Sequence, residues 1–149
     1  MSQEGREHFA RIGILAGGQR PNDLALADIE KALTAIRYLA PFNTGRAVVV
    51  SRAYILAVAA AEPPIAMLER VRALRQWGVG AKKRIGVLAA HAKPGEWDAD
   101  KIEALIGRAA AAGLAGIVVT GPAAALAAFE GAGEAADGHE LFLALTEER

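Results

Sequence analysis

The chain has 149 residues, of which 53% are hydrophobic and 23% charged, and its 17 basic and 17 acidic side chains cancel at neutral pH. This composition is typical of a globular domain and excludes a disordered or fibrous protein, and the balanced charge gives no general attraction to nucleic acid. The absence of cysteine excludes disulfides, thiolate nucleophiles and cysteine-ligated zinc.

The N-terminal stretch MSQEGREHFARIGILAGG has acidic residues where a signal peptide needs basic ones, and no apolar run reaches the roughly 18 residues of a membrane span. We therefore expect a soluble, cytoplasmic protein with no transmembrane segment, which leaves peripheral contact with a membrane open. Residues 11–23 form a short apolar run that ends in Gly17-Gly18, a pattern that predicts a strand or extended arm followed by a turn. We assign residues 1–22 to an N-terminal arm or linker and residues 23–149 to a single α/β domain.

A helix is predicted over residues 23–39, because Asn22 can cap it and Pro41 follows it. Its apolar stripe at helical spacing consists of Leu26, Ile29, Leu33 and Ile36. Its charged residues, expected on other faces, are Asp28, Glu30, Lys31 and Arg37. Residues 46–60 then contain two β-branched or aromatic runs on either side of Ser51-Arg52, which predicts a hairpin whose turn lacks the usual glycine.

Two more helices alternate with buried strands in the next part of the chain. The first begins at Pro63-Pro64, stops at Gly78, and directs to the core Ile65, Leu68, Val71, Leu74 and Trp77. A buried strand with a polar exit follows within residues 81–95. Asp98 can cap the second helix, which ends at Gly113 and buries Ile102, Leu105 and Ile106. The segment AGIVVTG predicts another buried strand.

The last part of the chain gives an ambiguous pattern before a final strand in ELFLAL. Alanine favours a helix from Pro122, but Gly131 and Gly133 would each cost about 1 kcal/mol inside it. Strands that alternate with helices indicate an α/β fold: a mixed sheet with an antiparallel strand pair and helices packed on it, as a two-layer or three-layer sandwich.

Segments 28–75, 87–98, 109–121 and 139–146 carry motifs such as Gly45-Arg46-Ala47-Val48-Val49-Val50 and Ala92-Lys93-Pro94-Gly95. In order and spacing they resemble the C-terminal domain of the UDP-2,3-diacylglucosamine pyrophosphatase family of lipid A biosynthesis. The resemblance covers nearly the whole chain and implies that most of the family's N-terminal domain is absent. Residues 11–23 are then either a linker or a remnant of that domain.

The resemblance implies magnesium-dependent hydrolysis of a UDP-sugar pyrophosphate, releasing UMP and an acylated sugar phosphate. An Ala-Lys-Pro-Gly-Gln-Asp box carries essential acidic chemistry in the family, and residues 92–95 match its first four positions. We expect Asp98 as the catalytic residue and Asp98 with Asp100 as magnesium ligands. The expected substrate-binding residues are Lys93, Gly95, Glu62, Thr120 and Gly121, the last two because a glycine turn after a buried strand can present N–H groups to an anion.

Several acidic positions of the family differ in this chain. Glu96 replaces the glutamine of the box, Trp97 stands where its aspartate follows, and Asp98 restores that aspartate only with one inserted residue. Ala59 and Ile65 take the places of two further acidic residues. Because hard cations need several oxygen ligands, we expect weak hydrolase activity or none. The alternative for residues 91–102 is a strand-to-helix turn in which Asp98 caps the helix and Asp100 complements its dipole.

Two functions follow from these patterns. The first is a shortened, diverged pyrophosphatase that binds a UDP-sugar or other phosphate ligand and, if active, hydrolyses it with magnesium. The second is a non-catalytic binding or assembly domain that acts with a partner protein or as a homo-oligomer. Loss of a covering domain should expose an apolar face, so we expect a homodimer. His91, beside the box, is the one histidine that suggests an acid or base, and its place at a strand end is the alternative.

Overall fold

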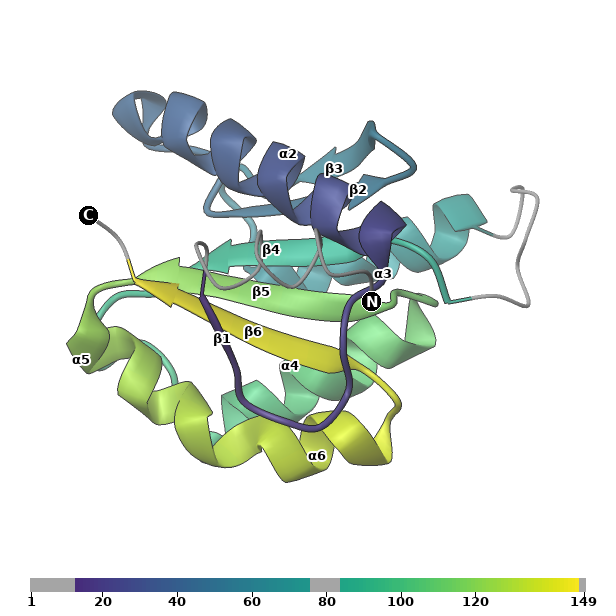
Figure 1. Cartoon of the computed structure of the whole chain (residues 1–149). Coiled ribbons are helices and arrows are strands. Elements are labelled where there is room, and N and C mark those ends of the chain that lie inside the picture. The colour runs from purple at the N-terminus through teal and green to yellow at the C-terminus, as the bar shows by residue number, and fades with distance from the viewer. Residues whose placement is uncertain (1–12, 76–83, 148–149) are drawn as a thin grey trace.

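The computed structural model describes residues 13–75 and 84–147. Its centre is a six-stranded sheet in the order β1-β6-β5-β4-β2-β3 (Figure 1). The strands are β1 (Ile14–Leu15), β2 (Ala47–Ser51), β3 (Tyr54–Val58), β4 (Val87–His91), β5 (Gly116–Gly121) and β6 (Phe142–Glu147). Strands β4, β5 and β6 are parallel, whereas β1 and the β2–β3 pair join antiparallel. The predicted mixed sheet with an antiparallel strand pair is confirmed.

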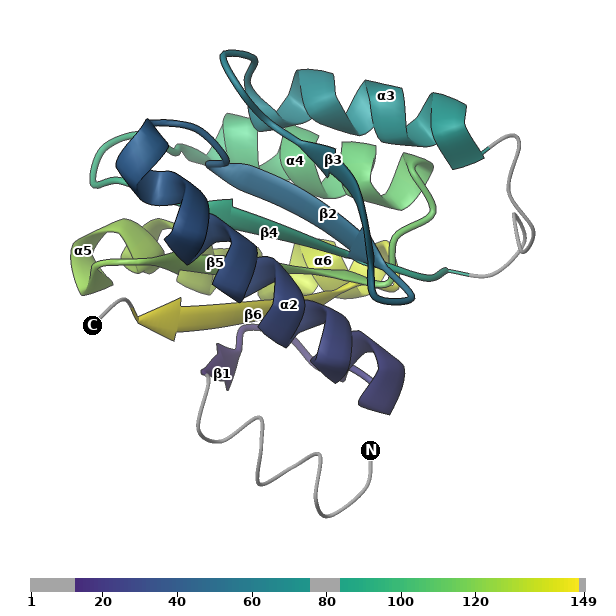
Figure 2. The same cartoon turned by 90° about the horizontal axis from the view of Figure 1, so that it is seen from above.

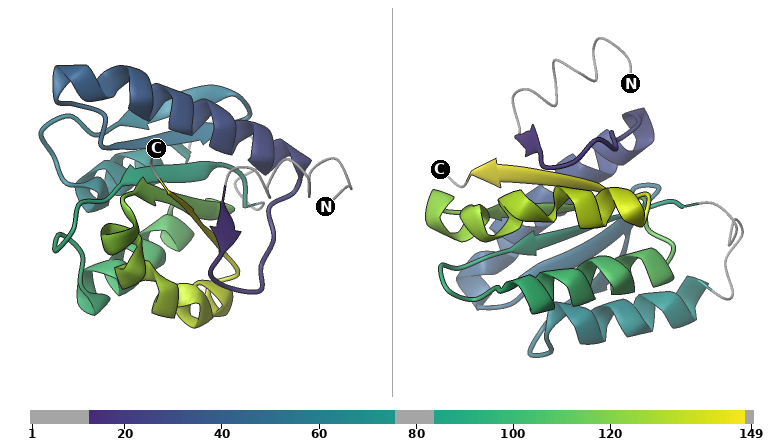
Figure 3. Two further views of the ribbon diagram at one scale, coloured as in Figure 1. Left: turned by 60° about the vertical axis from the view of Figure 1, so that its left-hand side comes forward. Right: turned by 90° about the horizontal axis from the view of Figure 1, so that it is seen from below.

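Helices cover both faces of the sheet, which resolves the architecture as three layers (Figure 2). One face carries α2 (Asp23–Leu39), which continues into the short 3-10 helix η1 (Ala40–Phe42). The other face carries α3 (Pro64–Arg75), α4 (Ala99–Ala111) and the successive short helices α5 (Ala123–Leu126), η2 (Ala127–Ala132) and α6 (Gly133–Gly138), as the right panel of Figure 3 shows. A separate apolar core lies between each helical layer and the sheet.

Helix α2 has the predicted bounds because its cap and its apolar stripe agree. The Asn22 side chain accepts a hydrogen bond from the Ala25 N–H at 2.8 Å, and Leu26, Ile29 and Ile36 are buried against the sheet. The prediction for Asp28 was wrong, since this residue is 1% exposed and does not lie on an outer face. Its carboxylate accepts hydrogen bonds from the backbone N–H groups of the β2–β3 turn, which makes burial of the charge tolerable.

The predicted hairpin is present, but its turn lies one residue later than expected. Ser51 still belongs to β2, and Arg52 and Ala53 form the turn with φ of 50° and 69°. Two consecutive left-handed residues suit the twist of a two-residue hairpin, a conformation for which glycine or asparagine is usual. The hydrogen bonds from Asp28 therefore stabilise a backbone conformation that the local residues disfavour.

Helix α3 starts as predicted and is buried through Leu68 and Val71, but Leu74 is 52% exposed. Figure 2 shows the last turn of α3 extending past the ends of the strands. The expected core position of Leu74 was therefore wrong. The predicted contributions of Trp77 and Gly78 lie outside the described residues.

The second half of the chain follows the predictions until its last helical segment. Asp98 caps α4, whose Ile102, Leu105 and Ile106 are buried, and Gly113 follows the helix with φ of 76°. The ambiguous segment after Pro122 is helical but broken into α5, η2 and α6. Gly133 is required where α6 begins, because a Cβ there would lie 1.9 Å from the Ala16 carbonyl oxygen.

Residues 13–22 pack onto the domain through two sets of hydrogen bonds. β1 pairs with β6, and the N–H groups of Gly18 and Gln19 donate to the Asp137 carboxylate of α6 at 2.9 and 3.1 Å. These contacts fix the path of the chain from the sheet edge to the start of α2. Within residues 13–75 and 84–147, no helix is both long and apolar enough to cross a membrane.

Candidate functional site

A row of polar side chains crosses the sheet where the three parallel strands end. The sheet register pairs His91 with Thr120 and Thr120 with Thr146, and the His91 N–H donates to the Arg46 carbonyl oxygen at 2.7 Å. Each of these residues lies an even number of positions from a residue that packs under α2, so the side chains point to the α2 face. The row is thus built by strand register, from residues far apart in the sequence.

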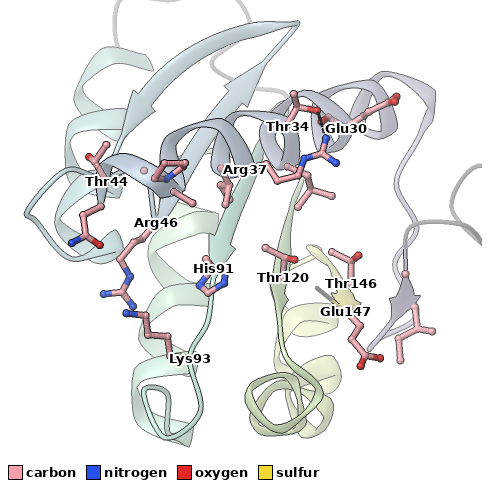
Figure 4. A pocket seen from close by; sticks show the side chains of 18 residues that line it. Glu30, Thr34, Arg37, Thr44, Arg46, His91, Lys93, Thr120, Thr146 and Glu147 are labelled. Atoms are coloured by element: carbon pink, nitrogen blue, oxygen red, sulfur yellow. Dashed lines mark hydrogen bonds between the residues drawn. The ribbon is translucent and has the colours of Figure 1, made fainter. Parts of the chain in front are cut away.

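These side chains line an open groove of about 1200 Å³ between the sheet and the C-terminal half of α2 (Figure 4). The carboxyl ends of parallel strands are the usual position of ligand sites in α/β proteins, because helices cover the faces but not this edge. The polar and charged side chains along the groove are Glu30, Thr34, Arg37, Asn43, Thr44, Arg46, His91, Lys93, Thr120, Thr146 and Glu147. Leu33, Ile36 and Pro41 supply apolar surface along its α2 and η1 side.

The charges are unevenly distributed along the groove. Figure 4 shows the tips of Arg46 and Lys93 together near the end of β4, with Glu147 at the opposite end beside β1. Arg37 projects from α2 between these two ends, and its guanidinium donates to the Thr34 hydroxyl at 3.3 Å. A phosphoryl group would be attracted to the end that holds Arg46 and Lys93, since both are strong donors to phosphate oxygens.

The loop after β4 is held in place by Glu96 and Trp97. Gly95 forms its turn with φ of 76°, and the Glu96 N–H donates to the Lys93 carbonyl oxygen at 3.1 Å. The Glu96 carboxylate forms an ion pair with Arg46 and accepts from the Trp97 indole N–H at 3.0 Å. The Trp97 ring packs against Phe129, with 5.6 Å between ring centroids. Lys93 is therefore presented to the groove by a loop that is anchored to the core.

The structure brings together two of the residues predicted to form the site, Lys93 and Thr120. Gly95 lies in the exposed turn behind Lys93, and Gly121 packs so closely that a Cβ would lie 2.4 Å from the Ala92 carbonyl oxygen. The helix that follows Gly121 has only four residues and lacks a side-chain cap, so it offers no N-terminal anion site. Gly121 instead supports the site through its close packing against Ala92. Glu62 forms an ion pair with Arg70 of α3 and does not line the groove.

Asp98 and Asp100 are both exposed, and neither lines the groove. The Asp98 carboxylate accepts from the Lys101 N–H at 2.8 Å as the N-cap of α4, and Asp100 lies in the first turn of that helix. The capping contact and the dipole position foreseen in the alternative interpretation are both present. The catalytic and metal-binding roles of these two residues stay predictions.

The described side chains do not fit a magnesium site. Among residues 13–75 and 84–147, no three His, Cys, Asp or Glu side chains come close enough to share a metal ion. The cationic end of the groove offers nitrogen donors and hydroxyls, whereas Mg²⁺ prefers carboxylate oxygens. Anion binding is the chemistry that these side chains support.

Sequence reasoning missed Arg37, Arg46 and Thr146 as lining residues of the groove. A signal was present for two of them, because Arg46 directly precedes a buried strand and Thr146 falls near the end of another. Nothing in the sequence showed that these ends meet, since that requires the strand order.

Comparison with known proteins agrees with the fold and the motifs. Residues 13–144 match the family described as the LpxI C-terminal domain, a region that includes β1 and its glycine turn. Over 98 residues the chain is 43% identical to the UDP-2,3-diacylglucosamine pyrophosphatase LpxI of Caulobacter vibrioides, a match that covers 62% of this chain and 35% of that protein. The matched family region spans nearly all of the described structure. The chain belongs to the LpxI C-terminal domain family.

Proposed function

We propose that the chain binds a phosphate-bearing ligand of the nucleotide-sugar class in the groove, as a diverged relative of the pyrophosphatase with weak hydrolase activity or none. The observation that carries this proposal is the meeting of Arg46, His91 and Lys93 at the carboxyl end of β4. The similarity to a protein that acts on a UDP-sugar supports the ligand class.

In this proposal each part of the groove has a separate role. The Arg46 guanidinium binds two phosphate oxygens through its planar fork, and the Lys93 ammonium adds a point charge. The hydroxyls of Thr120 and Thr146 accept and donate further along the sheet edge. The uncharged part of the ligand lies against Leu33 and Ile36 of α2, where apolar surface lines the groove.

Weak hydrolysis or none follows from the carboxylates available. Hydrolysis at phosphorus needs a cation or general base that positions water and neutralises charge on the phosphoryl oxygens. Glu30 and Glu147 line the groove from different elements, α2 and β6, and Figure 4 shows them apart. Asp98 and Asp100 lie outside the groove. The groove therefore favours binding over catalysis.

Isothermal titration calorimetry with UMP and UDP-glucose, with and without magnesium, tests the proposal. Arg46→Met should weaken UMP binding by roughly tenfold or more, because it removes a charge-assisted contact of about 1.5–3 kcal/mol. Lys93→Met should have a similar effect. Arg72→Met is the matched control, since Arg72 is exposed on α3 and does not line the groove. An unchanged affinity in both Arg46→Met and Lys93→Met would refute the proposed site.

The level of hydrolysis is a separate measurement on the same protein. Release of UMP from the UDP-sugar should be slow or absent and should not increase strongly with magnesium. Rapid magnesium-dependent release that is lost in Asp98→Ala would instead assign this chain a full pyrophosphatase activity, with Asp98 as its catalytic residue.

A non-catalytic assembly domain is the second candidate, favoured by two exposed aromatic side chains beside the groove. Tyr38 and Phe42 are 75% and 76% exposed, and Phe42 lies between two residues that line the groove. Exposed apolar groups at one place are a feature of association surfaces. Sedimentation velocity at roughly 100 μM should show a homodimer that Phe42→Ser weakens, because micromolar dissociation constants give mostly dimer at that concentration. A monomer at that concentration would contradict this candidate.

A further inference from the structure

Arg46 already has an anionic partner at the cationic end of the groove. The Glu96 carboxylate forms an ion pair with it, while the side chains are 46% and 26% exposed. Lys93, in contrast, makes no ion pair with any residue of the described parts of the chain. The two cations therefore differ: Lys93 is available to a ligand, and Arg46 is partly neutralised by a residue of the protein.

The position of Glu96 is fixed by a second contact that does not involve the groove. One carboxylate oxygen accepts from the Trp97 indole N–H at 3.0 Å, and the other faces Arg46. Trp97 is itself held against Phe129, which is 1% exposed in the core below. The Lys101 ammonium also donates to the Glu96 carbonyl oxygen at 3.3 Å. Glu96 is thus presented to Arg46 by an anchored loop, and the ion pair is more than a chance surface contact.

From this arrangement we infer that Glu96 is a resident anion that competes with the ligand for Arg46 and so determines which anions the groove accepts. This inference rests on the proposed function and deepens it. A ligand that binds the Nη2 group of Arg46 must replace the Glu96 carboxylate there. A phosphate monoester such as UMP carries a charge of about −1.5 to −2 and three acceptor oxygens. It can therefore replace the Glu96 carboxylate at Arg46 more readily than a ligand carboxylate can, since that group has a charge of −1 and two oxygens. The groove should therefore select phosphate esters and reject carboxylates.

The substitution Glu96→Gln isolates this role, because glutamine keeps an acceptor for the Trp97 indole and loses only the charge. Titration calorimetry at low, fixed ionic strength should show UMP bound roughly three- to tenfold more tightly than by the unmodified protein, the range expected from removing a partly exposed ion pair and a nearby like charge. Succinate, a dicarboxylate probe, should bind detectably only to the variant. Glu69→Gln is the matched control, since it removes the Glu69–Arg108 ion pair between α3 and α4 outside the groove.

A double-mutant cycle separates competition for Arg46 from a general change in the loop. In an Arg46→Met background, Glu96→Gln should increase UMP affinity clearly less than it does when Arg46 is present, because only the repulsion between Glu96 and the ligand is then removed. Trp97 gives a second readout, since Trp77→Phe leaves it as the single tryptophan of the chain. Trp97 fluorescence should change on UMP binding when Glu96 is present, because UMP displaces the carboxylate that accepts from the Trp97 indole. The change should be smaller in Glu96→Gln.

The outcomes distinguish this inference from the function on which it rests. If the unmodified protein binds UMP and Glu96→Gln binds it equally within twofold, the role of Glu96 is refuted while the site stands. An equal gain in the Arg46→Met background also refutes it. If neither protein nor variant binds UMP, the proposed function fails and the inference fails with it.

Discussion

Replacing Asp28 should destabilise the protein more than replacing any exposed acidic residue. The Asp28 side chain is 1% exposed, and its two oxygens accept from the N–H groups of Arg52 at 3.1 Å and Ala53 at 2.9 Å. A hydrogen bond to a charged group contributes about 1.5–3 kcal/mol, and water can replace part of this at a turn. Asp28→Ala should therefore lower the free energy of unfolding by about 3 kcal/mol.

Urea unfolding followed by circular dichroism measures this change, and thermal unfolding should show a decrease in Tm of roughly 10 °C for a chain of this size. Asp28→Asn should cost about half as much, because one oxygen remains to accept while the amide group opposes the second N–H. Asp100→Ala is the control: it is exposed in the first turn of α4 and should cost less than about 1 kcal/mol.

The turn that Asp28 supports provides an independent test of these hydrogen bonds. Ala53 has φ of 69°, so Ala53→Gly should relieve part of a left-handed strain and stabilise the fold by about 0.5–1 kcal/mol. A loss of less than about 1 kcal/mol in Asp28→Ala would refute the account, because it would show that the two hydrogen bonds do not hold the hairpin.

Three further predictions concern a close glycine contact, a helix cap and the attachment of the N-terminal segment. Gly121→Ala should cost at least about 2 kcal/mol and also weaken UMP binding, because its Cβ would lie 2.4 Å from the Ala92 carbonyl oxygen next to Lys93; denaturation and calorimetry on one sample check both effects. Asp98→Ala should cost about 1 kcal/mol through loss of the α4 cap and leave UMP affinity unchanged, whereas lost binding would assign Asp98 to the site. Asp137→Ala should release the Gly18 and Gln19 N–H groups, which amide hydrogen exchange should detect as faster exchange near β1 with little change in β4.

Much of the fold was predictable because local signals agreed with the tertiary structure. Asn22 and Asp98 mark the starts of α2 and α4 by capping, and apolar spacing identifies the faces that these helices bury. The parallel strands are short apolar runs between turn signals, so their positions were also clear. These features depend on residues within a few positions of one another.

The errors arose where contacts join distant residues. The charge of Asp28 indicated a solvent-exposed position, but the N–H groups that it binds lie 24 and 25 residues later. Leu74 has the spacing of a core residue, yet it is exposed in the last turn of α3, which extends past the ends of the strands. Gly133 made the last helix ambiguous, and its reason is contact with Ala16 more than a hundred residues earlier.

The groove was only partly predictable for the same reason. Lys93 and Thr120 were recognisable because each follows or ends a buried strand beside a turn. Arg46 and Thr146 join them through strand order and register, which the sequence does not display. The Arg46–Glu96 ion pair likewise joins residues fifty positions apart. In the sequence Glu96 is only a departure from the family's box, whereas in the structure it is the partner of a groove residue.

Nuclear magnetic resonance titration of the ¹⁵N-labelled protein with UMP tests most directly whether the polar row across β4, β5 and β6 is a phosphate site. The account predicts that the largest amide shift changes fall at His91, Lys93 and Thr120, with smaller changes at Thr146. Changes confined to the start of α4 around Asp98, or none at saturating UMP, would contradict it.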